Sequence, residues 1–435
     1  MAHPISSTFE TVKYWAGQRL LHSRFHSAYL KLTGHDQKVH TYAEWLKAES
    51  RVADAREELP RKYQLVLPDG ATLSPDAGHW FRLAIDATGA DVVYTDEDLV
   101  APDGSRSDPV FKPAWSPELH KHCDYLGGAY LARVGSDESP AGKIVHIPKV
   151  LIQRITPAVY ETRTVSEEPP PRLLVSIIIC SRNSELAATC VQAIRSTTAY
   201  EPYEIVLMDH QAGMPKLPGV TIVPYKEDFN FAKMCNAGAK ASRGELLLFL
   251  NDDTAPLDPE WMGLLARQAA RADIGAAGAL LTYPDGRIQH AGIYVGTPNG
   301  AGHPGRLSTG SPMWPWLTMT REQLAVTGAC LMTRRDVFER LGGFDESFPV
   351  NYNDVDYCLR TGRSGLKVIL EARARVEHRE SASRKIGIRY TERRRFIDRW
   401  ADTIQRGDPY WNPNLTDNEL LLPNPEAAAS EIKWR

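Results

Sequence analysis

The pattern of apolar and polar residues predicts a parallel α/β sheet in the second half of the chain. A continuous apolar, largely β-branched run over 173–180 ends at the polar residues Ser181, Arg182 and Asn183, which is typical of a buried strand followed by a loop. Further on, predicted helices alternate with predicted strands: helices over 185–196 and 231–241, strands over 203–208, 220–224 and 245–250. This alternation predicts a mostly parallel sheet with helices packed against it.

Polar residues follow three of these predicted strands at their carboxyl ends. They are Ser181-Arg182-Asn183 after the first strand, Asp209-His210 after the second and Asn251-Asp252-Asp253 after the last. Ligands of open α/β sheets bind beyond the carboxyl ends of the strands. The sequence therefore predicts one ligand site at this edge of the sheet.

Self-similarity between the two halves of the chain predicts a duplicated module. Residues 65–76 align without a gap with 249–260, and two further matches follow in the same order: 102–104 with 284–286, and 127–131 with 327–331. The first copy lacks a counterpart of the 173–180 strand, and it has Leu67 and Pro68 where the second copy has Asn251 and Asp252. We expect the first copy to be non-catalytic, with a structural or acceptor-binding role.

A proline-rich segment separates the two copies. Three consecutive prolines, Pro169 to Pro171, cannot join a helix or a central strand and favour an extended spacer. The expected organisation is a degenerate, partial first domain over 1–165, a linker over 166–172, a catalytic domain over 173–411 and a C-terminal tail over 412–435.

Composition narrows the classes of function and the compartment. The formal net charge of −3 gives no reason to expect a nucleic-acid partner. No two of the six cysteines form a CxxC pair, so neither a zinc site nor a disulfide framework is indicated, and a reducing cytosol fits best. No apolar stretch is long enough to span a bilayer, and the N-terminus lacks a signal pattern. We expect a cytoplasmic protein, and peripheral association with the inner face of the membrane stays open.

The acidic motif Asn251-Asp252-Asp253 is the strongest single indication of chemistry. Adjacent carboxylates at the end of a buried strand repel one another, an arrangement that suits a bound divalent cation. Such a cation would bind the two phosphates of a nucleotide sugar. The alternative is a helix cap, because Pro259-Glu260-Trp261 follows as a predicted helix start.

Several motifs, in order along 173–411, resemble glycosyltransferase family 2: Val175 to Asn183, Phe229-Asn230-Phe231 with Asn236 to Ala239, Phe249 to Thr254, and Asn353-Asp354-Val355-Asp356. The first half resembles the degenerate first domain of two-domain members through 94–98 and 111–117. The resemblance implies a GT-A fold, a nucleoside-diphosphate sugar donor, a divalent metal (Mn or Mg) and inversion at the anomeric carbon. It also suggests O-antigen-like polysaccharide synthesis with rhamnose-type sugars, on a glycan or lipid-linked glycan acceptor.

The resemblance also implies roles for individual residues. It assigns Asp253 and His378 to the metal, and Asn251 at the first position of the DXD-like motif departs from the usual carboxylate. The donor set that it implies is Ser181, Arg182, Asp209, Asn236, Asn251, Asp252, Ser383 and Arg384.

On the acceptor side, family position indicates Asp354 as the general base, at the start of a predicted helix where the dipole keeps a carboxylate ionised. An N-cap is the alternative role. Asp356, on the opposite side of the helix, is expected to pack or cap. Trp316 and Gly328 are candidate acceptor contacts, although core packing is an equal alternative for Trp316, and His290 and His303 are taken as structural.

Two other functions compete with sugar transfer. Nucleotidyl transfer is disfavoured because no Gly-rich, Lys/Arg-bearing loop follows the first strand. A non-catalytic glycan-binding protein would need no cation and base together, so Asp253, Asp354 and His378 argue against it. The nucleotide (UDP, dTDP or GDP), the sugar, the linkage and the oligomeric state stay open.

Overall fold

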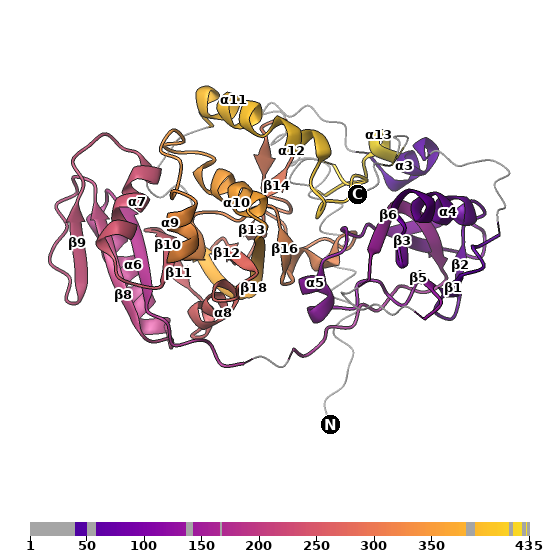
Figure 1. Ribbon diagram of the computed structural model, residues 1–435, viewed down its shortest axis with the longest axis horizontal. Coiled ribbons are helices and arrows are strands. Elements are labelled where there is room, and N and C mark those ends of the chain that lie inside the picture. Colours follow the sequence, from indigo (N-terminus) through magenta and orange to yellow (C-terminus); the bar gives the residue numbers. More distant parts are fainter. Residues whose placement is uncertain are drawn as a thin grey trace. The chain divides into compact units, whose positions relative to one another are not determined.

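The computed structural model describes residues 40–49, 58–135, 142–165, 168–379, 388–416, 421–428 and 432. Residues 42–435 group into one compact unit, and its described residues form a six-stranded first sheet, a ten-stranded second sheet and their helices (Figure 1). A two-stranded sheet of β14 (Tyr294–Val295) and β15 (Ala301–Gly302) accompanies them. No helix in the described part of the chain is long and apolar enough to cross a bilayer.

The second sheet contains the strands predicted from the apolar pattern. Its strand order is β11-β18-β12-β17-β10-β7-β8-β9, with β13 on β12 and β16 on β18. The neighbouring strands β10, β7, β8 and β9 are parallel to one another, and β12 is parallel to β18. The bounds are β7 (Val175–Ser181), β8 (Tyr203–Asp209), β9 (Val220–Pro224), β10 (Leu246–Asn251), β11 (Thr254–Pro256), β12 (Ile274–Thr282), β13 (Ile288–His290), β16 (Arg321–Gln323), β17 (Cys330–Arg334) and β18 (Lys367–His378).

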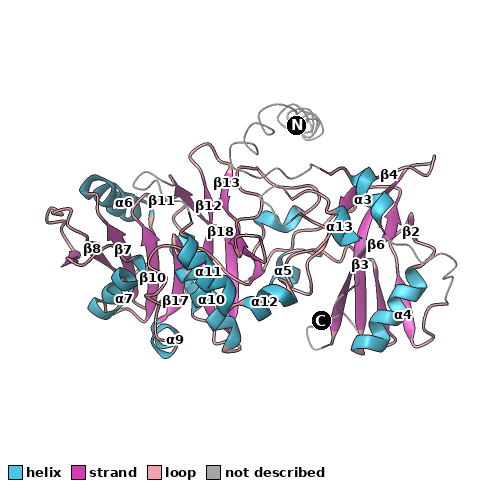
Figure 2. Ribbon diagram, turned by 90° about the horizontal axis from the view of Figure 1, so that it is seen from above, coloured by secondary structure: helices cyan, strands magenta, loops and turns pink. Residues whose placement is uncertain are grey.

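Helices pack against the second sheet, as the alternation predicted (Figure 2). Along β7, Ile177 and Ile179 belong to one apolar cluster with α6 and α8, whereas Ile178 and Cys180 belong to another with α7 and α10. The alternating side chains of one strand thus fill two cores, which is why the run is apolar throughout. The helices of this part are α6 (Ser184–Thr197), α7 (Phe231–Ala241), α8 (Trp261–Ala269), α9 (Arg335–Arg340), α10 (Asn353–Arg363), α11 (Tyr390–Arg399) and α12 (Ala401–Arg406), whereas α13 (Pro425–Ala428) packs against α3 (Tyr42–Ala48) of the first copy. The expected α/β fold class, a mixed sheet with flanking helices, is confirmed. The expectation of a mostly parallel sheet is corrected, because four strand pairs of the described second sheet are parallel and five are antiparallel.

The first sheet has the same strand order and strand directions as one part of the second sheet. Its order is β1-β5-β3-β6-β2 with β4 on β3, and the parallel or antiparallel sense of each pair is that of β10-β17-β12-β18-β11 with β13 on β12. The bounds are α3 (Tyr42–Ala48), β1 (Tyr63–Val66), β2 (Ala71–Leu73), α4 (Ala77–Thr88), β3 (Val92–Val100), β4 (Arg106–Val110), α5 (Pro117–His122), β5 (Tyr130–Arg133) and β6 (Ile144–Arg154).

Strand register agrees with the alignment read from the sequence. Leu65 lies opposite Leu131 in the first sheet, and their aligned residues Phe249 and Leu331 lie opposite each other in the second. Gapless alignment and identical pairing are two independent observations, so the chain holds two copies of one module.

The first copy lacks the parts that build a site in the second. Within the described residues, β1 is an edge strand, so nothing stands where β7, β8 and β9 extend the second sheet from β10. Ile155 occupies the position of His378, because it follows β6 beside Gly70, the counterpart of Thr254. Its side chain is exposed to 67%. These differences fit the expectation that the first copy does not catalyse.

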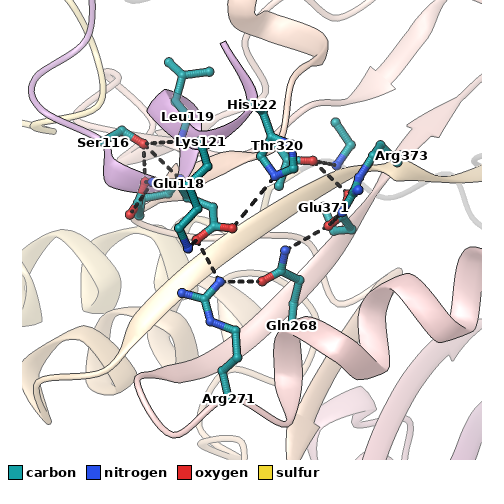
Figure 3. A network of polar contacts seen from close by, with 12 residues as sticks. Ser116, Glu118, Leu119, Lys121, His122, Gln268, Arg271, Thr320, Glu371 and Arg373 are labelled. Atoms are coloured by element: carbon teal, nitrogen blue, oxygen red, sulfur yellow. Dashed lines mark hydrogen bonds and ion pairs between the residues drawn. The ribbon is translucent and has the colours of Figure 1, made fainter. Parts of the chain in front are cut away.

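Buried polar contacts join the two copies (Figure 3). Ser116, the N-cap of α5, donates its hydroxyl to Glu322 of β16, and Glu118 pairs with Arg271 at 2.7 Å. Arg271 also donates to Gln268, whose amide donates to the buried Glu371 of β18.

The chain after α12 also belongs to this contact. The side-chain amide of Asn412 donates to both carboxylate oxygens of Asp96 in β3, at 3.0 and 2.8 Å, and Asn414 adds a bond to the carbonyl of Pro148. Trp411 stacks on Tyr294 of the second copy with ring centroids 4.5 Å apart. Asn412 and Asn414, at the start of the segment expected to be a tail, are therefore buried in contact with the first copy.

Candidate functional site

The strand register brings the predicted polar residues to one edge of the second sheet. Ser181, the last residue of β7, lies opposite Asp209 of β8, and Cys180 lies opposite Asn251 of β10. Parallel strands end at a common edge, so these side chains are neighbours although the sequence separates them widely. The predicted convergence is what the structure shows.

Asp252 is a buried carboxyl held by the end of β7. Its Oδ2 accepts a hydrogen bond from the Ser181 hydroxyl at 2.5 Å, and 8% of the residue is exposed. Burial raises the pKa of Asp252 to about 6; the Ser181 hydrogen bond opposes this rise, and the charge of Asp253 adds to it. A carboxyl whose pKa is raised in this way is stabilised in its ionised form when a positive charge binds beside it, so it suits a cation-binding site.

Asp253 and His378 form the second part of the cluster. Both are buried, and Nε2 of His378 lies 3.1 Å from Oδ1 of Asp253. The antiparallel pairing of β11 with β18, in which Thr254 lies opposite His378, holds the two side chains together.

The hydrogen bonding of this pair leaves room for a cation. The amide nitrogen of Asn251 lies 3.3 Å from Nε2 of His378; because an amide N–H only donates, Nε2 is the acceptor of this long hydrogen bond and carries no proton, the state in which an imidazole nitrogen binds a metal ion. No hydrogen bond from a described residue satisfies Asp253 Oδ1 or His378 Nδ1. A carboxylate oxygen and an imidazole nitrogen that converge in this way are the ligand types of a divalent transition ion. Across the described residues, no group of three His, Cys, Asp or Glu gathers, so oxygens of the diphosphate and water would complete such a site.

Asp354 lies at the start of α10. Its Oδ2 accepts the backbone N–H of Gly328 at 2.8 Å, and its Oδ1 accepts the N–H of Val355 at 2.8 Å. Burial raises the pKa of Asp354, and these two hydrogen bonds oppose the rise. The residue keeps some exposure, so its carboxylate is oriented yet accessible.

One turn connects Asp354 to the acidic motif. The carbonyl of Ala329 accepts the N–H of Asn251 at 3.0 Å, while the adjacent Gly328 donates to Asp354. Thr327 to Ala329 therefore contacts both groups, although the sequence showed it only as a repeat of 127–129 and gave no sign of this role.

The family model described as "Glycosyl transferase family 2" matches residues 176–342, which include Ser181, Asp252, Asp253 and Gly328. This part of the chain is a glycosyltransferase family 2 domain. The chain is 32% identical to "O-antigen biosynthesis protein RfbC" of Myxococcus xanthus over 79% of this chain and 33% of that protein. It is 30% identical to "Uncharacterized protein y4gI" of Sinorhizobium fredii over 86% of this chain and 51% of that protein. The chain thus spans about a third to a half of the length of these two relatives.

More distant similarities cover about half of the chain. An "N-acetylglucosaminyl-diphospho-decaprenol L-rhamnosyltransferase" of Mycobacterium tuberculosis is 24% identical over 43% of this chain and 70% of that protein. Among solved structures, "GalNAc-T7 with UDP, GalNAc and Mn2+" is 16% identical, with a TM-score of 0.44 and coverage of 54% of this chain and 50% of that one. The mannosyltransferase PcManGT of Pyrobaculum calidifontis, in complex with GDP-Man and Mn2+, is also 16% identical, with a TM-score of 0.37 and coverage of 50% and 60%.

Within the family 2 domain, Asp209 and Arg182 take different positions. The Asp209 carboxylate accepts the N–H groups of Ala212 and Met214 at 2.8 and 3.0 Å, so it orders the loop after β8. Arg182 is exposed, with its guanidinium 5.9 Å from the ring centroid of Phe229. Both lie at the edge of the sheet where β7 and β8 end, and their contact with a donor stays a prediction.

Asn236 of the family 2 domain holds a loop rather than joining the acidic cluster. Its side chain exchanges hydrogen bonds of 2.9 Å with the backbone of Phe344 and donates to Glu346 at 3.1 Å. The structure therefore shows it fastening the 342–346 loop to α7, and a donor contact stays a prediction.

Two polar neighbours of Asp354 are structural. Asp356 is fully buried and accepts hydrogen bonds from Arg360, Arg399 and the indole N–H of Trp400, at 2.8, 2.9 and 3.1 Å. Asn353 donates to backbone carbonyls of the preceding loop. The expected division holds: Asp356 faces the core and Asp354 faces Gly328.

Trp316 has no ring face for a sugar. It is fully buried, and it makes edge contacts with Tyr125 and Tyr160 of the first copy, at 6.0 and 5.6 Å between ring centroids. Its candidate acceptor role is therefore corrected to the alternative of core packing, because aromatic side chains of the first copy cover it. Gly328 contacts Asp354 and stays a candidate. Ser383 and Arg384, expected at the diphosphate, lie outside the described residues.

Proposed function

We propose that this chain transfers a sugar, with inversion, from a nucleoside-diphosphate sugar to a hydroxyl of a glycan or lipid-linked glycan. The observation that carries the proposal is the pairing of two features through one turn: the Asp252-Asp253-His378 cluster and the hydrogen-bonded carboxylate of Asp354.

Asp253 and His378 would hold a divalent cation, Mn or Mg, because Nε2 of His378 lies 3.1 Å from Oδ1 of Asp253, and this oxygen has no hydrogen-bond partner among the described residues. The ion would neutralise the charge that develops on the nucleoside diphosphate as it leaves. Ser181, Arg182, Asp209, Asn251 and Asp252 would bind the nucleotide, at the edge that their strands create.

Asp354 would act as the general base toward the acceptor hydroxyl. Burial raises its pKa, which makes its carboxylate a stronger base near neutral pH. The hydrogen bonds from Gly328 and Val355 fix its orientation. A base that activates the acceptor on the side of the anomeric carbon opposite the leaving diphosphate gives a single displacement, and hence inversion.

The first copy would serve structure or acceptor binding and not catalysis. It has Pro68 at the position of Asp252 and the exposed Ile155 at the position of His378. Asp69, the counterpart of Asp253, is exposed and therefore serves as a matched control for variants of the site.

The relatives suggest the class of acceptor. One is named for O-antigen biosynthesis and another for a decaprenol-diphosphate-linked acceptor. We place the reaction in cell-surface polysaccharide synthesis in the cytoplasm, at the inner face of the membrane, where a lipid-linked glycan would be available.

Thermal shift with UDP-, dTDP- and GDP-sugars, with and without manganese, tests donor binding. We expect one nucleotide class to stabilise the wild type only with the ion, and Asp253→Asn to abolish this effect while Asp69→Asn keeps it. Loss of turnover in Asp354→Asn with donor binding retained would support the base. Glycan binding without any nucleotide-dependent stabilisation would favour the non-catalytic alternative and overturn the proposal.

A further inference from the structure

His290 is a completely buried histidine that takes no part in the proposed chemistry. It ends β13, next to β12 in the second sheet. Its Nδ1 lies 3.0 Å from Nδ1 of His303. Its Nε2 accepts the backbone N–H groups of Gly292 and Thr327, at 3.3 and 3.4 Å. Both ring nitrogens therefore have partners, and one of these partners belongs to the turn beside Asp354.

The hydrogen bonds define the protonation of the ring. Because Nε2 accepts backbone donors, it carries no proton, and the single proton of the neutral ring is on Nδ1 and points to His303. Burial lowers the pKa of His290 well below its ordinary value, and the nearby His303, Arg321 and His378 lower it further. His290 thus stays a neutral acceptor with a fixed tautomer.

The turn that His290 supports provides hydrogen-bond donors to Asp354, the proposed base. Nε2 of His290 accepts the N–H of Thr327. The next N–H along the chain, that of Gly328, donates to Oδ2 of Asp354 at 2.8 Å. The Thr327 side chain also lowers the pKa of Asp354 through a hydrogen bond. A side chain at Gly328 would bring a Cβ within 3.3 Å of Asp354 Cβ, so the approach is close. Rotation of the Thr327–Gly328 peptide would move the Gly328 N–H away from the Asp354 carboxylate.

Other titratable groups near Asp354 do not replace these donors. Cys235 of α7 and Cys358 of α10 both interact with Asp354. Burial raises the pKa of the Cys358 thiol to about 12 and that of Cys235 well above its ordinary value, so both stay neutral. The charge on the Asp354 carboxylate therefore depends on backbone and hydroxyl donors of the turn and of α10.

We propose that His290 is a positioning residue for the base: by accepting the N–H of Thr327 it fixes the turn in which the next N–H, of Gly328, orients and stabilises the Asp354 carboxylate. This inference rests on the proposed role of Asp354. His290 itself touches neither donor nor acceptor in this scheme, and its effect on turnover passes through the turn.

The test compares His290→Phe, which removes the acceptor nitrogen, with His290→Gln, whose amide oxygen keeps one. Ile288→Val, a buried change on the same strand, controls for loss of packing. Asp354→Asn controls for the proposed function. Each full-length variant is assayed for turnover across pH, for donor affinity and for thermal stability.

We expect His290→Phe to lower kcat by about a hundredfold and to move the acid limb of its pH profile up by about one pH unit. The limb moves because a carboxylate that loses hydrogen-bond donors is protonated more readily. Donor affinity should not change, His290→Gln should restore most of both effects, and Ile288→Val should leave the pH profile in place.

The outcomes separate the two proposals. Near-normal turnover in Asp354→Asn refutes the base and the positioning role together. An inactive Asp354→Asn with an unshifted pH profile in His290→Phe overturns only the positioning role. If His290→Phe does not fold, Thr327→Val removes the hydroxyl donor at the other end of the link, and an unshifted profile there also overturns it.

Discussion

Replacing Asp252 by Asn should stabilise the metal-free protein while abolishing donor binding. The carboxyl is buried, lies next to Asp253 and has a pKa of about 6 against 3.8 in an unfolded chain. A shift of about two units corresponds to about 3 kcal/mol of unfolding free energy that the ionised Asp252 removes from the wild type. Asn has the same shape, carries no charge and can still accept the Ser181 hydrogen bond, so the variant should recover most of this difference.

The pH dependence has a defined sign. A group whose pKa is raised on folding contributes stability that is complete below its unfolded pKa and is lost as pH rises through its folded pKa. The free energy of unfolding of Asp252→Asn should therefore exceed that of the wild type by about 3 kcal/mol at pH 7.5. This difference should shrink between pH 6 and pH 4 and fall to about 0.5 kcal/mol at pH 4.

Denaturant unfolding in EDTA at several pH values measures this difference, with the exposed Asp69→Asn as the control for loss of one charge. Manganese with the donor should reverse the order, because positive charge stabilises the ionised carboxylate only in the wild type. Equal stability at pH 7.5, or a difference that does not shrink on acidification, would refute the reasoning.

Three further variants test the surrounding structure. Asp356→Asn should lower the free energy of unfolding by about 3–5 kcal/mol, since it leaves two arginines short of a buried carboxylate, and denaturant unfolding measures this loss. Asn412→Ala should cost about 2–3 kcal/mol because the buried Asp96 carboxylate loses one of its two side-chain amide donors, Asn414 being the other, and faster proteolysis of the first copy should accompany the loss. Asp69→Ala should leave turnover unchanged, and a loss as large as that of Asp253→Ala would contradict a single active site per chain.

The sequence determined the strands and the edge where they end. The run over 173–180 became β7, and the strands predicted to end at 180, 208 and 250 end one residue later, at Ser181, Asp209 and Asn251. Local patterns sufficed because a strand buried on both faces must be apolar throughout, and a chain that leaves the sheet must become polar. The duplication could also be predicted from the sequence, because the aligned residues Leu65 and Phe249 lie opposite residues that are themselves aligned, Leu131 and Leu331.

Only the tertiary structure decided the environments of the individual side chains. Trp316 was read as a candidate for an exposed ring, but its burial depends on Tyr125 and Tyr160, which lie far away in the sequence. Asn412 was assigned to a tail, whereas Asp96 of the first copy holds it in the core.

The site shows the same division between sequence and structure. The motifs that resemble glycosyltransferase family 2 placed Asp253, Asp354 and His378 in one expected site, whereas residue type alone left a helix cap or packing as the alternative for each. They did not show that one turn, Thr327 to Ala329, links the acidic motif to the base, or that His290 supports it. Sequence periodicity reports which way a strand or helix faces, whereas hydrogen bonds between backbone and side chains depend on how separate elements are packed.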